Sequence, residues 1–471
     1  MTTLHPRDDD LMAEEKQDKF VMDFDVTERA DRPPQEYYDD IKAKFAEERD
    51  LRLEYRPPGT ENYRDLDGAM ADLARDPYAD DWVERTPIDD VANGGEVEVL
   101  FIGGGFSALL TSARLREKGV ESIRIVERGA DVGGTWYWNR YPGARCDSES
   151  HTYCYYFDRL LLEEWSWSER YPGQAEILRY LNFCARKLNL EKDIHFNERV
   201  LESEWDSDAR LWHVKTQTGK TFRARFLITA VGCLSSANIP NIDGLADFEG
   251  EVYHTGQWPH EKVEFDKKTV VIIGTGSTGI QAIPEIARQA KKLYVLQRTP
   301  NYSVPARNSP LSKDFHSAFI KEIDAWRSKM LKSRHGHPWT APDRQVRKTE
   351  PEKRQNIMEA AWERGGLGFR ESFDDVLLNE ESNKIMSDFI RQKIVDTVHN
   401  AKTAKKLLPI DHPFGTKRPP IDTNYFETFN CDHVHLIDTK VEEMCQAIND
   451  IGGAVCGKSL PSLDLENFAD S

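Results

Sequence analysis

The chain has 471 residues, enough for two or three domains at roughly 150 residues each. Its 81 acidic and 63 basic residues give a formal net charge of -18, which argues against nucleic acid or an anionic membrane as the main partner. The start, MTTLHPRDDDLMAEEKQDKF, lacks the basic and apolar regions of a secretory signal, and no stretch approaches the roughly 18 apolar residues of a membrane span. The seven cysteines form no CxxC pair, so neither a disulfide framework nor a metal site is indicated. We expect a cytoplasmic protein with reduced thiols that acts on small molecules.

Residues 1–95 are highly charged and are interrupted by turn signals such as RPPQ and RPPGT. The patch DDIKAKFAEERDLRLEY within them favours a helix. We interpret this region as an N-terminal extension, partly helical and partly disordered. The character of the sequence changes at EVEVLFI, residues 96–102, which is typical of a buried strand. A helix in TSARLREKG and a strand in SIRIVERG follow, so a βαβ unit is predicted over about 97–128.

The turn after the first strand carries a glycine-rich fingerprint for a dinucleotide. Gly103 and Gly105 begin a GxGxxG pattern whose last position is Ala108. Small residues there let a pyrophosphate approach the helix N-terminus, where free N–H groups and the helix dipole favour negative charge. Glu127 ends the next strand 24 positions after Gly103, where a carboxylate can accept hydrogen bonds from both ribose hydroxyls. The alternative is a glycine-rich loop with a solvent-exposed glutamate.

An aromatic stretch, GGTWYWNRYPGARCD, follows this unit at residues 133–147. Gly133 and Gly134 can let the chain run along a flavin, and four aromatic residues can shield its ring system from water. These are Trp136, Tyr137, Trp138 and Tyr141. An ordinary buried aromatic cluster is the alternative that the residues alone leave open.

A second βαβ unit begins at Thr269, with Gly274, Gly276 and Gly279 in its turn. The position 24 residues after Gly274 is Arg298, followed by Thr299. An arginine there favours the 2′-phosphate of NADP(H), whereas a carboxylate would repel it. An ordinary surface cation is the alternative for Arg298. FAD in the first site and NADPH in the second is the economical assignment, because one can pass hydride to the other.

The fold class expected is α/β, with two Rossmann-like dinucleotide-binding domains for FAD and NADP. Segment RLWHVKTQTGKTFRARFLITAVG is similar to strands that return to the first sheet. The apolar spacing of 315–330 places Phe315, Phe319, Ile320, Ile323, Trp326 and Met330 on one helical face, which indicates packing rather than a ligand site. We predict an FAD-binding domain at 96–245, joined by 420–471 but incomplete, and an NADP-binding domain at 246–419 with a helical insertion at about 310–405.

Three segments together are specific for one family. GGTWYWNRYPGARCD resembles the flavin-proximal segment of type I Baeyer-Villiger monooxygenases, most of all in the phenylacetone monooxygenase branch. FEGEVYHTGQWP, residues 248–259, matches the family fingerprint FxGxxxHxxxW(P/D) through Phe248, Gly250, His254 and Trp258. HPFGTKR, residues 412–418, is the third match. The resemblance covers about 97–440.

This resemblance implies a flavoprotein oxidoreductase that uses FAD, NADPH and O2 to insert one oxygen atom beside a ketone carbonyl, giving an ester or lactone. It implies Arg418 as the catalytic cation and Asp147 as the carboxylate that orients it. His254 resembles a residue that couples domain movement more than a direct catalyst. The flavin contacts implied are Gly134, Thr135, Trp136, Tyr137, Trp138, Asp147 and Tyr153. The NADP contacts implied are Arg145, Cys146, Asp147, Thr275, Gly276, Ser277, Thr278, Gly279, Ile280, Gln281, Arg298, Thr299 and Lys417.

The resemblance stops after NYFETFNCDHVHLIDT, where family members continue into a strand that completes the flavin domain. The tail from KVEEMC onward resembles neither a strand nor the family pattern, so we expect a C-terminally truncated chain that binds flavin poorly. Two rivals stay open: a flavin monooxygenase that oxidises nitrogen or sulfur, and a non-catalytic remnant that binds dinucleotides. The ketone is not specified, although the N-terminal extension resembles those of members that act on bulky ketones, as in secondary metabolism.

Overall fold

In the computed structural model, the described residues are 35–55, 63–64, 75–79, 95–235, 237, 239–240, 245, 248–333, 336–339 and 343–438. The chain forms two compact units, residues 1–62 and 63–471. In the first unit the described element is helix α1 (Gln35–Tyr55), which confirms the helix predicted in the N-terminal extension. The tail after residue 438, and with it the expectation of an irregular C-terminal segment, lies outside the described residues.

The first sheet of the second unit has six strands in the order β4-β3-β2-β7-β6-β5. Its elements, with the helices that pack beside them, are β2 (Glu96–Ile102), α2 (Phe106–Arg116), β3 (Ile123–Val126), α3 (Thr135–Trp138), α4 (Arg159–Glu164), α5 (Gln174–Lys187), β4 (Ile194–His195), β5 (Val200–Asp206), β6 (Leu211–Thr216) and β7 (Thr221–Thr229). Strands β4, β3, β2 and β7 are parallel, while β6 is antiparallel to both β7 and β5. The predicted βαβ unit and the returning strands are therefore confirmed.

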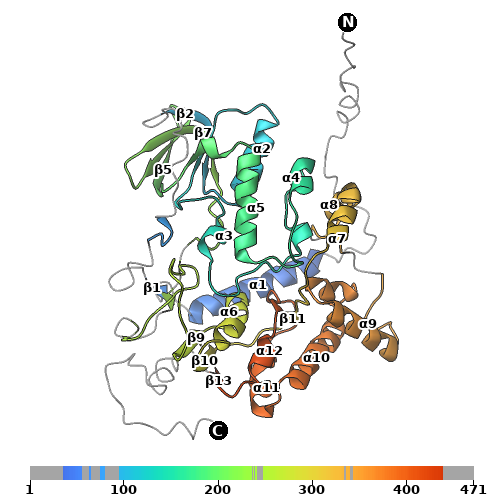
Figure 1. The fold of residues 1–471 in the computed structure, drawn as a ribbon. Helices are drawn as coiled ribbons and strands as arrows, with labels where there is room; N and C mark the ends of the chain where they lie inside the picture. Colours follow the sequence, from blue (N-terminus) through green and yellow to red (C-terminus); the bar gives the residue numbers. More distant parts are fainter. Residues whose placement is uncertain are drawn as a thin grey trace. The chain divides into compact units, whose positions relative to one another are not determined.

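The core of the first half, meaning the first sheet and its helices, depends on the alternation of residues 99–101 in β2. Val99 and Phe101 pack with α2 and α5, which lie along one face of the sheet (Figure 1). Leu100 faces the other way, into a cluster with Val214 and Phe222 of the antiparallel strands. Burial on both faces explains why this strand reads as an almost continuous apolar run.

The second sheet is parallel, in the order β13-β10-β9. Its elements are β9 (Thr269–Ile273), α6 (Ser277–Ala287), β10 (Lys292–Gln297) and β13 (Val434–Asp438). The second predicted βαβ unit is thereby confirmed. Two short pairs accompany it: β11 (Val304–Pro305) with β12 (Ile421–Asp422), and β1 (Tyr63–Arg64) with β8 (Ile239–Pro240). Because β12 and β13 pair with strands of this half, the assignment of residues from 420 onward to the first sheet is corrected for 421–438.

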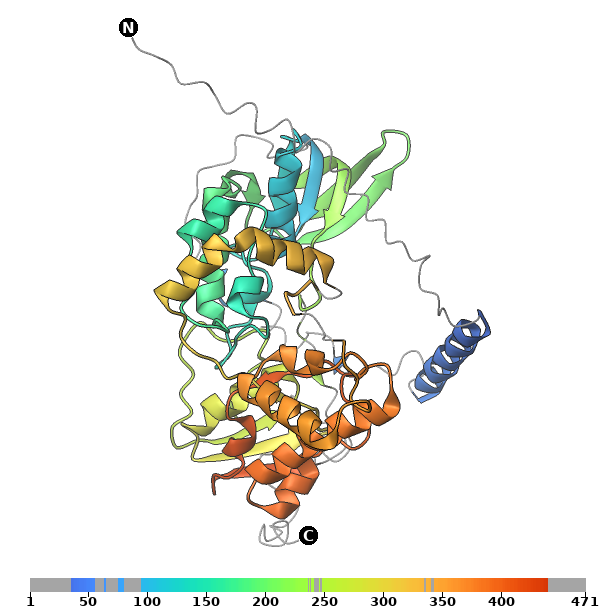
Figure 2. The same cartoon turned by 90° about the vertical axis from the view of Figure 1, so that its right-hand side faces the viewer.

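The region 310–405 is helical, as expected, but its members divide between the two halves. It contains α7 (Lys313–Lys321), α8 (Ile323–Lys332), α9 (Pro351–Arg364), α10 (Glu380–Thr397) and α11 (Ala401–Leu407), and α12 (Tyr425–Thr428) follows. Phe319 and Ile323 pack against Leu162 of α4, whereas residues of α9 to α12 join the core of the second sheet. Figure 2 shows the gold α7 and α8 beside the green helices of the first half.

The predicted aromatic stripe is a packing surface, but it lies on two helices rather than one. Glu322 leaves helical geometry at φ -105° and ψ 13°, and its N–H bonds back to Ala318 and Phe319. The chain turns there, so Phe315 and Trp326 reach the same cluster from α7 and α8. Among the described helices, none is long and apolar enough to cross a membrane.

Candidate functional site

The first glycine turn is shaped by close contacts that leave no room for a side chain. Gly103 has φ +102°, and a Cβ there would lie 2.6 Å from the carbonyl oxygen of Ala230, beyond the end of β7. Gly105 is the N-cap of α2, so the helix begins directly at the turn. The backbone N–H groups at this helix start can therefore face an anionic ligand, as the fingerprint predicts.

Glu127 follows β3 and is buried, so the solvent-exposed alternative is wrong. Its Oε2 accepts the N–H of Gly104 at 2.5 Å, and its Oε1 accepts the N–H of Gly129 at 2.7 Å. Burial raises the pKa of Glu127 above its ordinary value, opposed by these two hydrogen bonds. The carboxylate thus lies against the glycine turn, where the sequence placed a ribose contact.

The aromatic residues of 133–147 do not form one wall. Trp136 donates its Nε1–H to the hydroxyl of Tyr153 at 3.1 Å and lies in the core of the first half. Tyr137 and Trp138 are buried in another cluster, and the Trp138 ring stacks under the guanidinium of Arg128 at 4.1 Å. Tyr141 points to helix α6 instead. The four aromatic residues expected to shield a flavin thus lie in three separate environments.

Gln281 of α6 connects the second half to this stretch. Its Oε1 accepts the hydroxyl of Tyr141 at 2.7 Å, and its Nε2 donates to the carbonyl of Arg145 at 3.1 Å and to Asp147 Oδ1 at 3.3 Å. Gly143, at φ +80°, allows this approach, because a Cβ there would collide with the backbone carbonyl of Gln281. Segment 144–146 also pairs with 172–174 through a bridge between Arg145 and Gly173.

The two residues implied as catalytic meet in space. Arg418 Nη2 lies 3.5 Å from Asp147 Oδ2, with side-chain exposures of 67% and 8%. Burial raises the pKa of Asp147 to about 6, while Arg418 and Gln281 pull it down. Burial also raises the pKa of the neighbouring Cys146 to about 12, so this thiol stays protonated and is no nucleophile at neutral pH.

The second glycine turn is open at its first two glycines and closed at Gly279, where a Cβ would collide with the carbonyl oxygen of Gly274. Cβ atoms built on Gly274 and Gly276 would meet no described atom within 4 Å, which fits a turn that a pyrophosphate approaches. Thr275 Oγ1 donates to the carbonyl of Thr299 at 3.4 Å, so the turn and the end of β10 lie together. Arg298 is exposed directly after β10, and Lys417 is exposed on the segment that carries Arg418.

The remaining predicted contacts lie on the same elements. Thr135 is exposed at the start of α3, after the N-cap Gly134. Ser277, Thr278, Gly279 and Ile280 form the first turn of α6, and Ile280 is buried. The side chains that the structure leaves accessible near the second turn are thus mostly small or polar.

The fingerprint segment forms a turn whose last residue is buried. His254 Nδ1 accepts the N–H of Gly256 at 3.1 Å, and its backbone pairs with Gln257. The ring of Phe248 lies 2.5 Å from where Gly250 would carry a Cβ. Trp258 is buried against Tyr253 and Phe265. His254 is thus held in this turn by local contacts.

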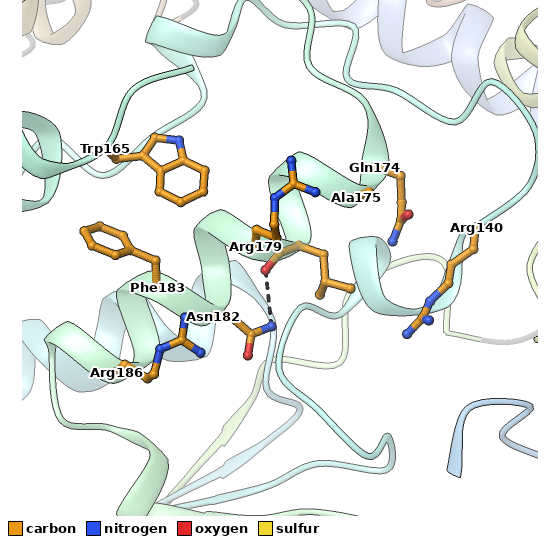
Figure 3. A pocket seen from close by; sticks show the side chains of 9 residues that line it. Arg140, Trp165, Gln174, Ala175, Arg179, Asn182, Phe183 and Arg186 are labelled. Carbon is orange, nitrogen blue, oxygen red and sulfur yellow. Dashed lines mark hydrogen bonds between the residues drawn. The ribbon is translucent and has the colours of Figure 1, made fainter. Parts of the chain in front are cut away.

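A surface groove of about 600 Å³ lies along α5, shown in Figure 3. Figure 3 shows side chains of α5 with Arg140 at one end and Trp165 at the other. The residues that line the groove are Arg140, Trp165, Gln174, Ala175, Leu178, Arg179, Asn182, Phe183 and Arg186. None of them was predicted to contact a cofactor. The groove borders the candidate site, since Arg140 and Gln174 donate hydrogen bonds to the backbone carbonyls of Tyr137 and Trp136.

Sequence reasoning missed two residues that contact the site. The hydroxyl of Tyr137 donates to Asp76 Oδ2 at 2.8 Å, and the hydroxyl of Tyr78 donates to the carbonyl of Trp258. Both lie in the N-terminal extension, in the short segment RDPYA at 75–79. A tyrosine inside a charged, turn-rich segment is the only signal there, and it has no periodicity to mark it.

Known proteins match this sequence and this fold. Residues 100–358 match the family described as pyridine nucleotide-disulphide oxidoreductase. A 2-oxo-Delta(3)-4,5,5-trimethylcyclopentenylacetyl-CoA monooxygenase of Pseudomonas putida is 39% identical over 356 residues, covering 74% of this chain and 65% of that protein. A Baeyer-Villiger monooxygenase of Streptomyces coelicolor is 33% identical over 449 residues, covering 91% and 70%. The crystal structure of the OTEMO complex with FAD and NADP is 39% identical with a TM-score of 0.71, covering 74% and 66%.

The two dinucleotide-type folds and these matches define the class as the pyridine nucleotide-disulphide oxidoreductases. Within that class, the chain belongs to the family of Baeyer-Villiger monooxygenases. It spans 65% of the length of the Pseudomonas putida relative.

The Gln281 contacts lead to a stability prediction. Gln281→Met keeps the size of the side chain but removes its hydrogen bonds to Tyr141, Arg145 and Asp147. We expect the free energy of unfolding to fall by about 1–3 kcal/mol, because partly buried polar groups lose their partners. Denaturant unfolding followed by circular dichroism measures this change. Gln289→Met, at an exposed position after α6, is the matched control and should stay within about 0.5 kcal/mol. If the free energy of unfolding falls equally in the two variants, the stabilising role assigned to the Gln281 hydrogen bonds is contradicted.

Proposed function

We propose that this chain binds FAD at the first glycine turn and NADPH at the second, and inserts one oxygen atom of O2 beside the carbonyl of a small ketone. The product is an ester or lactone. The observation that carries the proposal is the contact of Arg418 with Asp147, at the point where Gln281 joins the two halves. Residues 96–245 are proposed as the FAD-binding domain, and 246–419 together with β13 as the NADP-binding domain.

The residues present fit both cofactors. The first turn offers the N-terminus of α2 and the buried carboxylate of Glu127 for a pyrophosphate and a ribose. The second turn has open space at Gly274 and Gly276, with the exposed cation of Arg298 at the end of the next strand. When bound, FAD and NADPH supply the oxygen-transfer and hydride chemistry. A cytoplasmic location belongs to the same proposal and is supported by the described cysteines, which are all free.

The residues of the chain itself contribute electrostatic stabilisation of the reacting groups. Asp147 is buried and holds Arg418 by charge, and Gln281 fixes the carboxylate by donating to Oδ1. Arg418 then supplies a positive charge at a set place, which stabilises an oxyanion as it develops on the ketone oxygen. The guanidinium is more than half exposed, so it can turn from Asp147 towards a substrate without leaving the site.

Purification of the chain followed by a product assay tests this proposal. The proposal requires protein-bound flavin absorption, ketone-dependent NADPH consumption and an ester or lactone product, whereas a flavin-free protein would agree with the poor flavin binding expected from the sequence. Arg418→Ala should lower the rate of ester formation by about 100-fold or more, since it removes the cation at the developing charge. Bound flavin should be unchanged, and Arg288→Ala, an exposed arginine paired with Glu285, is the control. An N-oxide or sulfoxide as the sole product would favour the heteroatom-oxidising rival, and absence of all turnover would favour the non-catalytic remnant.

The pKa of Asp147 predicts an acid limb in the pH profile. Above about pH 6 the carboxylate is charged and holds Arg418; below it the pair is lost, so kcat/KM should fall with a midpoint near pH 6. Stability should respond in the opposite direction. Because the folded pKa lies above the ordinary 3.8, protonation of Asp147 favours the folded state, and its contribution to stability is lost as pH rises through about 6.

Two measurements across pH 4–8 separate these effects: kcat/KM and the free energy of unfolding. Asp147→Asn should remove the change in stability between about pH 4 and 6 that comes from this group. A wild-type rate that stays constant down to pH 5 would contradict the role of the ion pair.

Arg298 predicts the choice of nicotinamide cofactor. Arg298→Ala should reduce the preference for NADPH over NADH by about tenfold, the value of a charge-assisted contact of about 1.5 kcal/mol. Steady-state kinetics with each cofactor measure the ratio, and Arg288→Ala again provides an exposed arginine as control. An unchanged ratio in Arg298→Ala would assign the 2′-phosphate to other residues.

A further inference from the structure

Tyr78 is among the most deeply buried aromatic residues described, although it lies ahead of the first βαβ unit. Its side chain is 1% exposed. The ring meets Tyr137 edge to face with centroids 5.7 Å apart, and the guanidinium of Arg140 lies 3.5 Å above it. A buried ring between an aromatic edge and a cation is held from two sides. Tyr78 is therefore fixed against α3 and the residues that follow it.

The hydroxyl of Tyr78 reaches a different segment. It donates a hydrogen bond to the backbone carbonyl of Trp258, the last fixed residue of the fingerprint. The ring also lies 6.0 Å from that of His260, two residues further on. One side chain thus contacts both the flavin-proximal helix and the segment between the two sheets.

Asp76 adds a second attachment on the α3 side. Its Oδ2 accepts the hydroxyl of Tyr137 at 2.8 Å, and its Oδ1 accepts the backbone N–H of Tyr78 at 2.9 Å. The hydroxyl of Tyr137 also accepts the N–H of Ala130 at 3.0 Å. The short segment 76–78 is consequently bound to Tyr137 of α3, which is itself bonded to the β3–α3 loop, and to the fingerprint.

We propose that Tyr78 is a positioning residue that ties the flavin-proximal helix α3 to the fingerprint segment at Trp258. Tyr78 acts through Tyr137 and Trp258, and it need not touch a cofactor. The rigid ring of Tyr78 holds both α3 and the segment between the sheets. A displacement of that segment is therefore transmitted to α3. Its meaning for catalysis rests on the proposed function, whereas the tether can be tested without any cofactor.

Hydrogen exchange on the whole chain tests the tether. Tyr78→Phe keeps the ring contacts and removes only the hydroxyl that bonds Trp258. We expect amide exchange in residues 134–140 and in 253–260 to become about tenfold faster in this variant, with α10 unchanged as an internal reference. Tyr180→Phe is the matched control, since it removes another buried hydroxyl, one that accepts the N–H of Tyr155 within the first core. Wild-type exchange in either segment of Tyr78→Phe would overturn the proposal.

A second variant covers the other end of the tether. Asp76→Asn leaves Tyr78 and its bond to Trp258 in place and weakens the bond from Tyr137. Exchange should then increase more in 134–140 than in 253–260. An equal or reversed pattern would overturn the proposal even if Tyr78→Phe folded poorly.

Binding of NADP⁺ separates the tether from the proposed function. With FAD added, Tyr78→Phe should raise the Kd for NADP⁺ about threefold or more at unchanged flavin content, and Tyr180→Phe should not. If Tyr78→Phe binds NADP⁺ as tightly as the wild type, the coupling role of the tether is wrong. If the wild type binds no NADP⁺, the proposed function fails, while the exchange experiment still decides whether the tether exists.

Discussion

The burial of Asp147 is the constraint on which the site depends. A carboxylate taken out of water must find charged or hydrogen-bonding partners, or remain protonated. Here the partners come from two distant parts of the chain, Gln281 of α6 and Arg418 after the helical region. These contacts of one carboxylate therefore fix the position of the second half relative to segment 133–147, and Gly143 allows the two backbones to approach closely enough.

The two glycine turns show how one sequence pattern serves two purposes. In the first turn, Gly103 lies against Ala230 and the N–H of Gly104 is already bonded to Glu127, so the turn is braced by its own sheet. In the second, Gly274 and Gly276 face open space. A braced turn suits a cofactor that stays bound through many reaction cycles, and an open turn suits one that must enter and leave.

The sequence was a good guide wherever the signal was local. Strand runs, glycine spacing and the 24-residue interval located both βαβ units and placed Glu127 and Arg298 at strand ends. The pairing of Asp147 with Arg418 came only from family resemblance, because no spacing marks two residues so far apart. Residues 420–471 were predicted to join the FAD-binding domain, but β13 within them pairs with β10 of the second sheet, a long-range contact that the local sequence does not mark. The role of Tyr78 could not be predicted, because no sequence pattern marks it. Its partners are the Tyr137 ring, the Arg140 guanidinium and the Trp258 carbonyl, all from later segments.

The Asp147–Arg418 pair also sets an order of events during synthesis. The ribosome makes the six strands of the first sheet by residue 229, so that sheet can form while the rest of the chain is still being made. The partners of Asp147 are synthesised afterwards, first Gln281 and then, much later, Arg418. Until residue 418 emerges, the carboxylate has its amide partner but no cation. The nascent first half is thus left open at the place where the second half will dock, and the site closes only near the end of translation of the described chain.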